Sequence, residues 1–442
     1  MKLHPLLLRF AAIGAVAASI LVPIALVEGK IAERRMRAES VLQQFAAETS
    51  GPQVVAGPFL TLACEETYAS ERQIMRAGKA ETITEKKVRP CPTAYVAPRV
   101  LEVSGKVPVE ELRRGIYPIR LYRATLRLAG DITWPSPPRI EGRAWRHATL
   151  VLYVRDARGI REVRATPQDA PDAQRGSDAR FALRTRLGEY MPASAGTRLP
   201  FDISLELVGT SSLGIAPTGD ETRIALTSDW PHPSFMGAWS PDQRHVAANG
   251  FDATWRTTHH ATGGQAAWEK AAGAQTPFQG NAVAGITLFD PVNVYALSYR
   301  ATEYGFLFVL FTFGALALAE VLAGVRLHAV QYLLVGSALA VFFLLLLALS
   351  EHIAFTHSYV AAASACVALL TFYLRHPLGS RRRAAAFLGL FSAMYAALYV
   401  LLRSEDHALL MGSLLVFSLL AVAMVATRRV DWSALSVRLA SQ

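Results

Sequence analysis

The sequence lacks the motifs by which many enzymes and nucleic-acid-binding proteins are recognised. It has no phosphate-binding P-loop, no GxGxxG fingerprint, no HExxH zinc motif and no GxSxG nucleophile elbow. No repeat with a period of 20 to 50 residues is visible. Lys and Arg outnumber Asp and Glu by 45 to 35, but they form no basic stripe with interleaved aromatics. We therefore expect no enzyme, no cofactor and no nucleic-acid partner.

Cysteine is scarce, with only Cys64, Cys91 and Cys366 in 442 residues. If the region around the first two faces an oxidising compartment, they can form a disulfide worth about 3.5 kcal/mol in the chain-entropy model. Two unrelated buried thiols are the alternative. Cys366 lies in an apolar stretch among small residues, where we expect it to serve packing alone.

The histidines of the soluble region are dispersed, and the adjacent pair His259 and His260 is expected on opposite faces of a strand. We therefore predict no metal site. The segment 228–237 combines Trp, Phe and three prolines or glycines with His. It is either a recognition loop or, more in keeping with such compositions, a rigid connection whose aromatics cover a sheet.

Apolar residues make up 52% of the chain and are unevenly distributed. Residues 10–27 form a first stretch long enough to cross a bilayer, and no Ala-x-Ala cleavage site follows it. We interpret it as an uncleaved signal anchor, with a cleaved signal peptide as the alternative. Five further stretches predict transmembrane helices, at residues 304–324, 330–349, 353–374, 385–402 and 409–426.

The basic residues of the short connections predict the orientation of these spans, because Lys and Arg favour the cytoplasmic side. Arg326, a cluster at 375–383 and the pair at 428–429 all belong to one side, whereas 350–352 and 403–406 are neutral or balanced. Residues 1–9 and 427–442 are then cytoplasmic, and residues 28–303 are periplasmic. The basic residues at 30–37 argue against this orientation, because they follow the anchor closely.

For the region 28–303 we predict a short helical stalk, or a continuation of the anchor helix, followed by strands. Apolar and polar residues alternate with period two in the segments 120–128, 148–155, 201–208, 251–257 and 285–289. An antiparallel β-rich domain is predicted, either a sandwich or large curved sheets, with a loose loop at 168–177. The fold class is therefore an α+β membrane protein, with an N-terminal transmembrane anchor, a β-rich extracytoplasmic domain and a C-terminal five-helix transmembrane bundle.

Polar residues at membrane depth are costly and often functional. We select as candidate functional residues those in or beside the predicted spans: Arg300, Glu303, Glu320, His328, Gln331, Ser350, Glu351 and His352. They either pair with one another at the interface, or transmit a state of the outer domain into the bundle, or line a small pathway. Against a transporter, no pair of broken half-helices and no inverted repeat is visible.

Several segments resemble the CreD family of cell-envelope integrity proteins. The similarity is carried by residues 300–305, 312–320, 328–336 and 345–355, and by shorter matches at 114–117, 122, 232–237 and 250–255. The L-x-L-S-E-H run that ends at His352 is the most specific of these. Where the family commonly has Lys before the Tyr that opens the first C-terminal span, this chain has Glu303.

The resemblance implies an inner-membrane protein under the CreB and CreC two-component system, linked to envelope integrity, stress response, colicin tolerance and the response to β-lactams. It implies no catalytic activity. Our leading hypothesis is a non-enzymatic protein of this type, in which the periplasmic domain engages an envelope component or protein partner and is coupled to the bundle in the lipid bilayer. The alternative is a transporter or lipid-handling protein that uses the polar residues of the bundle.

Overall fold

The computed structural model describes residues 5–76, 79–137, 140–166, 181–189, 194–264, 282–288, 293–323, 327–404 and 408–428. The predicted loop at 168–177 lies outside these residues. The chain divides into two compact units. We call residues 1–39 with 292–442 the helical unit, and residues 40–291 the β domain. Helix α1 (Pro5–Glu48) contributes to both, because the division falls between Glu39 and Ser40.

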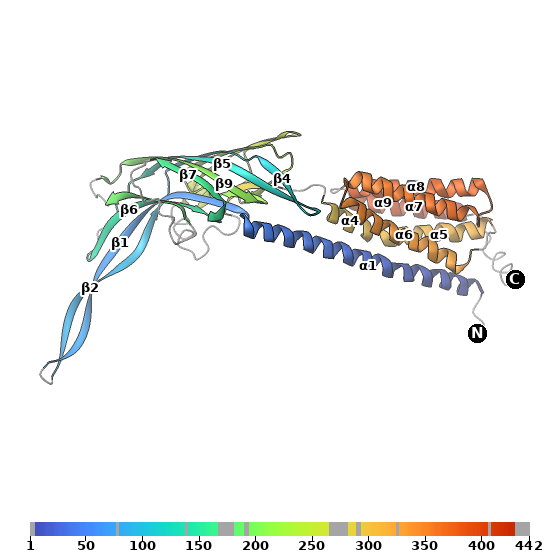
Figure 1. Cartoon of the computed structure of the whole chain (residues 1–442), viewed down its shortest axis with the longest axis horizontal. Helices are drawn as coiled ribbons and strands as arrows, with labels where there is room; N and C mark the ends of the chain where they lie inside the picture. The colour runs from blue at the N-terminus through green and yellow to red at the C-terminus, as the bar shows by residue number, and fades with distance from the viewer. Residues whose placement is uncertain are drawn as a thin grey trace. The chain divides into compact units, whose positions relative to one another are not determined.

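The β domain is built from two sheets (Figure 1). The seven-stranded sheet has the order β12-β15-β10-β1-β6-β8, with β2 paired to β1. Its strands are β1 (Gln53–Arg76), β2 (Lys79–Val96), β6 (Arg143–Val154), β8 (Phe181–Glu189), β10 (Ser212–Ile215), β12 (Pro233–Gly237) and β15 (Ala284–Leu288).

The eight-stranded sheet has the order β13-β14-β11-β3-β5-β9-β7, with β4 paired to β5. Its strands are β3 (Val100–Lys106), β4 (Val109–Arg114), β5 (Tyr117–Thr133), β7 (Ile160–Thr166), β9 (Arg198–Thr210), β11 (Glu221–Ser228), β13 (Gln243–Ala247) and β14 (Gly250–Thr258). A short 3-10 helix, η1 (Ala157–Gly159), precedes β7, and α2 (His259–Thr262) follows β14.

The alternating segments of the sequence correspond to β5, β6, β9, β14 and β15, so the prediction of a β-rich domain is confirmed. Most pairings are antiparallel, but β1 pairs with β10, and β3 with β11, in parallel. Alternation within one strand reports which residues face the core and carries no information about the direction of a distant partner. These two parallel pairings were therefore not predictable from the pattern.

The two sheets share one apolar core, which is the arrangement of a sandwich. It includes Leu60 and Leu150 from the seven-stranded sheet and Leu126, Leu205 and Trp255 from the eight-stranded sheet, all at most 1% exposed. The seven-stranded sheet also buries part of its opposite face, where Phe59 and Val151 belong to a second, smaller cluster. Its strands consequently contain continuous apolar stretches as well as alternating ones.

Strands β1 and β2 extend beyond the rest of their sheet as a long two-stranded ribbon (Figure 1). Cys64 and Cys91 face each other in the register of this pair, with their Cα atoms 5.2 Å apart, and are joined in a disulfide. The bond lies where β1 also pairs with β6. It therefore crosslinks the ribbon at its base.

The expectation for the histidine pair was wrong, whereas the structure supports one of the two interpretations of the segment 228–237. His259 and His260 do not lie on opposite faces of a strand: they begin α2, and their ring centroids are 3.8 Å apart. The end of β14 thus turns into a helix, which brings successive side chains closer than a strand does. The segment 228–237 is partly a strand, since β12 begins at Pro233. Trp230 packs against the core of the sandwich with Arg120 4.7 Å above its ring, which favours the rigid connection.

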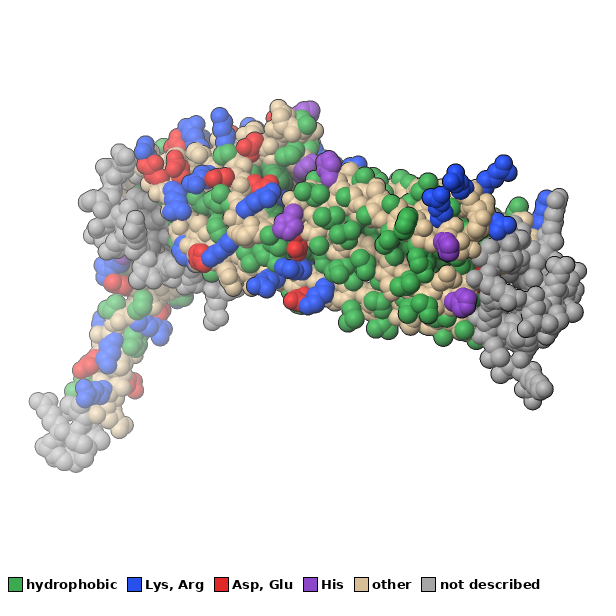
Figure 2. All heavy atoms as spheres, turned by 45° about the vertical axis from the view of Figure 1, so that its right-hand side comes forward, with side chains coloured by type: hydrophobic (Ala, Val, Ile, Leu, Met, Phe, Trp, Pro, Cys, Tyr) green, Lys and Arg blue, Asp and Glu red, His purple; other side chains and the backbone are tan. Residues whose placement is uncertain are grey.

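The helical unit contains a helix at each of the five predicted C-terminal stretches. They are α5 (Gly305–Ala323), α6 (Ala329–Ser350), α7 (Phe355–Arg375), α8 (Arg381–Arg403) and α9 (Ala408–Thr427), preceded by α4 (Val294–Glu303). By length and composition, α1, α6, α7 and α8 are candidate spans, and α4 with α5 forms a fifth that is bent by 42°. Hydrophobic side chains predominate among the side chains visible along these helices, apart from basic side chains at one end, whereas charged side chains are numerous over the β domain (Figure 2).

Candidate functional site

Helix α1 packs on the bundle along one stripe of its surface. Ile20, Ile24, Val27 and Ile31 are buried and follow one another at helical spacing of three and four residues. Opposite this stripe lie two glycines: a Cβ built at Gly336 would come within 2.5 Å of Ile20, and one built at Gly305 within 3.1 Å of Ile24. Small residues that let two helices approach are typical of helix packing in membranes.

The stripe on α1 ends at a polar cluster. Arg34 comes three residues after Ile31, and its Nε lies 3.6 Å from Oε1 of Glu351, at the C-terminal end of α6. The Oη of Tyr295, on α4, donates to the same oxygen at 3.4 Å. The Glu351 side chain is only 8% exposed, compared with 44% for Arg34. Three helices are thus joined through one nearly buried carboxylate, whose burial has to be compensated by such partners.

The neighbouring candidates have local roles. The Ser350 hydroxyl donates to the carbonyl of Leu347 at 2.9 Å, within its own helix. The backbone N–H of His352 donates to the carbonyl of Leu349 at 3.0 Å, and its side chain is exposed. Glu303 is exposed at the end of α4, and Arg300 is half-buried on the same helix.

The remaining candidates lie at the other end of the bundle. Glu320 accepts a hydrogen bond from the backbone N–H of Leu327 at 2.5 Å, which connects the end of α5 to the start of α6. The side-chain oxygen of Gln331 accepts from the backbone N–H of His328 at 2.9 Å, so both residues close the first turn of α6. The rise of an α-helix places Gln331 and Ser350 about 28 Å apart. The eight candidates therefore do not form one site.

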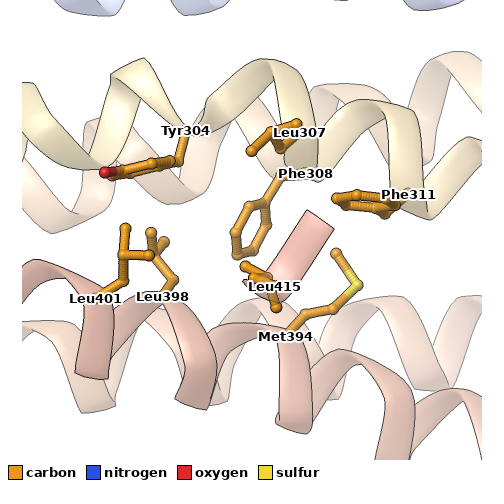
Figure 3. A pocket seen from close by; sticks show the side chains of 8 residues that line it. All are labelled: Tyr304, Leu307, Phe308, Phe311, Met394, Leu398, Leu401 and Leu415. Atoms are coloured by element: carbon orange, nitrogen blue, oxygen red, sulfur yellow. The ribbon is translucent and has the colours of Figure 1, made fainter. Parts of the chain in front are cut away.

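A small apolar cavity lies between α5, α8 and α9 (Figure 3). Its volume is about 10 Å³, and it is lined by Tyr304, Leu307, Phe308, Phe311, Met394, Leu398, Leu401 and Leu415. A space of this size holds at most one water and supplies it with few polar partners. None of the eight candidate residues contributes to it, so this cavity gives no support to a pathway through the bundle.

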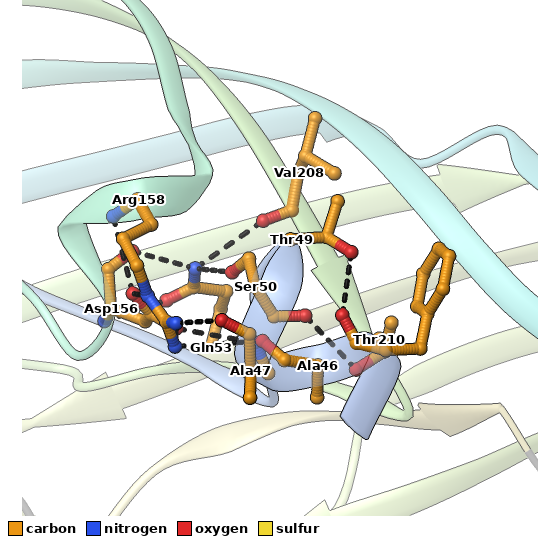
Figure 4. A network of polar contacts seen from close by, with 11 residues as sticks. Ala46, Ala47, Thr49, Ser50, Gln53, Asp156, Arg158, Val208 and Thr210 are labelled. Atoms are coloured by element: carbon orange, nitrogen blue, oxygen red, sulfur yellow. Dashed lines mark hydrogen bonds and ion pairs between the residues drawn. The ribbon is translucent and has the colours of Figure 1, made fainter. Parts of the chain in front are cut away.

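The C-terminal end of α1 is held within the β domain by a network of hydrogen bonds (Figure 4). Arg158, in η1, donates to the carbonyls of Ala46 and Ala47 in the last turn of the helix. The Gln53 amide donates to the Ser50 hydroxyl at 2.6 Å and to the Asp156 carbonyl at 2.9 Å. Helix ends leave carbonyls unsatisfied, and the guanidinium group supplies two of the missing donors.

Asp156 holds Arg158 in place by accepting its hydrogen bonds. Its carboxylate accepts from Arg158 Nη2 at 2.7 Å and from the backbone N–H of Gly51 at 3.3 Å. Burial raises the pKa of Asp156, but the hydrogen bonds from Arg158 and Gly51 outweigh this and hold the pKa below its ordinary value. The ionised form of Asp156 is therefore the one that positions Arg158, which in turn binds the end of α1.

The outer face of the eight-stranded sheet carries a hollow of about 320 Å³. Its lining includes small side chains such as Ser104, Ala129 and Ala225, the three arginines Arg127, Arg223 and Arg256, and the acidic residue Glu102. Arg223 and Arg256 are direct cross-strand neighbours, an unfavourable arrangement for like charges. Glu102 lies 3.7 Å from Arg223, and Asp202 pairs with Arg127, which leaves Arg256 without an ion pair among the described residues.

Glu351 is among the candidates predicted from the sequence, but its partners Arg34 and Tyr295 are not. Arg34 belongs to the basic group at 30–37 that argued against the predicted orientation. In the structure Lys30 pairs with Glu33 at 2.7 Å and Arg35 with Glu39 at 3.2 Å, while Arg34 faces Glu351. The spacing of Lys30 to Glu33 and Arg35 to Glu39 was visible in the sequence, whereas contact between residues 34 and 351 was not.

An N-terminal helix, a two-sheet β domain and C-terminal helices long enough to cross a bilayer define a multi-pass membrane protein with a large soluble domain. The chain belongs to the CreD family, because the family model described as inner membrane protein CreD matches residues 5–433. It is 31% identical over 428 residues to the inner membrane protein CreD of Escherichia coli (strain K12), covering 95% of this chain and 92% of the relative. It is therefore a multi-pass protein of the inner membrane.

Proposed function

We propose that this protein maintains the cell envelope without catalysing a reaction. In this proposal the β domain lies in the periplasm and engages an envelope component or protein partner, and α1 transmits that event to the helices in the bilayer. Stress response and colicin tolerance, which the family resemblance implies, are the cellular processes in which we expect it to act.

The observation that carries the proposal is the continuity of α1. One uninterrupted helix of 44 residues supplies the apolar stripe that packs on the bundle and the last turn bound by Arg158. A helix resists bending because its interior residues are hydrogen-bonded to the preceding turn, and Pro23 is the residue of α1 that cannot donate such a bond. A displacement of one end of such a helix moves the other end as well, whereas a flexible linker would absorb it.

The hollow lined by Arg127, Arg223 and Arg256 supports an anionic partner for the β domain. Guanidinium groups bind carboxylate and phosphate groups in a bidentate manner. The double variant R223Q/R256Q should therefore lose envelope protection, while R164Q, an exposed arginine on β7 outside the hollow, should retain it. Equal protection by the two variants would exclude this surface as the contact.

The experiment that tests transmission interrupts α1 at Ser40, an exposed residue at the division between the units. Proline there removes one helical hydrogen bond and clashes with the preceding turn, at a cost of about 3 kcal/mol. S40P and the control S40A would be expressed in cells lacking their own CreD-family protein, with membrane levels measured by immunoblot. We expect S40A to restore resistance to detergent and colicin, and S40P to fail at equal abundance.

Full restoration by S40P would contradict transmission through α1. The transporter alternative makes a different prediction, because it depends on the bundle alone. Deletion of the β domain would then leave the activity intact, whereas E320Q or E351Q would abolish it without loss of protein. Under our proposal the deletion removes the activity, and E320Q affects only the stability of the α5–α6 connection.

A further inference from the structure

The turn between α7 and α8 forms a basic hollow at one end of the helical unit. Its volume is about 740 Å³, and its lining includes Gln331, Phe372, Tyr373, Arg375, His376 and Arg381. Lys and Arg side chains gather at this end of the helices in the space-filling view (Figure 2). None of these residues belongs to the polar cluster around Glu351.

The turn is ordered by contacts of its own. Leu378 is 1% exposed, and its N–H donates to the carbonyl of Leu374 at 3.0 Å. Gly379 has a φ of +60°, a left-handed conformation in which glycine is favoured, and its N–H donates to the carbonyl of His376 at 3.2 Å. Arg375 and Arg381 are therefore held on the two sides of a fixed turn.

The positive charges of the hollow are not neutralised by the protein. Arg375, His376 and Arg381 are exposed, and no acidic side chain in the described part of the chain forms an ion pair with them. The two arginines and the tyrosine that line the hollow carry the kind of donors that a phosphodiester accepts. The ligand of this hollow should accordingly carry a negative charge.

The ligand should also carry apolar groups. Phe372 and Leu369 lie one and two turns from Arg375 along α7 and are 78% and 58% exposed. Helix α7 is a candidate span, so this apolar surface continues towards the hydrocarbon of the bilayer. An anionic head beside exposed apolar side chains at the end of a membrane helix is the chemistry of a phospholipid.

We propose that this hollow is a specific site for an anionic phospholipid. Arg375, Arg381 and Tyr373 bind the phosphate of the headgroup, and the acyl chains lie along Leu369 and Phe372. The site would fix a lipid at the α7–α8 turn, independently of what the β domain engages. It differs from general attraction between basic residues and the membrane surface, because Arg382 is adjacent and exposed but does not line the hollow.

The test uses the full chain, purified in a neutral detergent and stripped of lipid. Binding of phosphatidylglycerol is measured by native mass spectrometry, with phosphatidylcholine and inorganic phosphate as separate probes. Loss of one charge-assisted phosphate contact should weaken phosphatidylglycerol binding about tenfold in each of R375Q and R381Q. R382Q should bind like the wild type, because Arg382 does not line the hollow. F372S should also weaken binding, through its acyl-chain contact.

Equal losses in R375Q, R381Q and R382Q would overturn the site in favour of diffuse attraction. Equal binding of phosphatidylcholine and phosphatidylglycerol would overturn the anionic specificity. Full displacement of the lipid by millimolar inorganic phosphate would identify a small-anion site instead. Monodisperse elution and an unchanged helical circular dichroism spectrum establish that each variant is folded.

Discussion

At the scale of single residues, Glu351 is the carboxylate that depends most on its partners, because it is nearly buried. It is shared by Arg34 and Tyr295. E351Q keeps an acceptor for Tyr295 but removes the negative charge that faces Arg34. Because Arg34 is partly exposed, we expect a loss of about 1 to 2 kcal/mol in the free energy of unfolding, less than for a fully buried pair. Thermal unfolding of the full chain in detergent measures this loss.

A double-mutant cycle with R34Q separates the ion pair from other effects of each substitution. If the pair contributes, R34Q/E351Q should be less destabilised than the sum of the single variants. Strict additivity would show that the 3.6 Å approach contributes nothing to stability. The transporter alternative predicts instead that E351Q abolishes activity while the unfolding temperature stays unchanged.

Asp156 gives a prediction that depends on pH. Its pKa is lowered in the folded protein, so its stabilising effect is complete above the ordinary pKa of about 3.9 and is lost as the pH falls through the folded value. D156N should therefore lower the unfolding temperature of the β domain at pH 7. The difference from the wild type should shrink as the pH falls below about 3.9 towards pH 3, because the carboxyl of Asp156 is then progressively protonated.

The control is D252N, which removes an exposed carboxyl from β14. It should shift the unfolding temperature little at either pH. A D156N deficit of the same size at pH 7 and pH 3 would contradict a role for the ionised carboxylate. That outcome would instead indicate that the substitution disturbs packing around η1.

At the scale of helices and strands, the fit between α1 and α6 depends on the absence of a side chain at Gly336. A Cβ there would lie 2.5 Å from Cγ1 and 2.8 Å from Cδ1 of Ile20. G336A should therefore destabilise the helical unit by about 1 to 2 kcal/mol, despite the higher helix propensity of alanine. G314A and G389A are matched controls, because a Cβ at either position meets nothing within 4 Å.

The controls should be neutral or stabilising by up to about 1 kcal/mol, since they gain helix propensity without a clash. Adding I20A to G336A should recover part of the loss, because the shortened side chain makes room for the new methyl group. Thermal unfolding in detergent compares all four variants. Destabilisation of G314A equal to that of G336A would show that α1 does not press on α6 at this position.

These elements also show what the sequence could predict. The alternation in β5 and β9 and the apolar runs of α6 and α7 identified the strands and helices, because one-dimensional patterns report burial. The polar candidates lie at the two ends of the bundle. Glu320 closes a local turn with Leu327, whereas Glu351 joins three helices through Arg34 and Tyr295. Contacts between distant segments, such as Arg34 with Glu351 or Arg158 with Ala47, leave no periodic signal and required the structure.

At the scale of the whole molecule, the proposed orientation places the β domain in the periplasm and the α7–α8 turn in the cytoplasm. The basic turn at 375–383 favours this. The basic residues after the anchor oppose it less than their number suggests, because Lys30 and Arg35 are paired with acidic residues on the same helix. Cysteine labelling tests the orientation with S204C, exposed on β9, and R382C, exposed on α8.

An impermeant maleimide should label S204C in intact spheroplasts and R382C only after the membrane is permeabilised. The native cysteines supply an internal check, because disulfides persist in the periplasm and are rare in the cytoplasm. Cys64 and Cys91 should therefore react only after reduction, and buried Cys366 should not react. Labelling of R382C alone in intact spheroplasts would reverse the orientation. It would also place Cys64 and Cys91 in a reducing compartment. Both thiols should then react without added reductant.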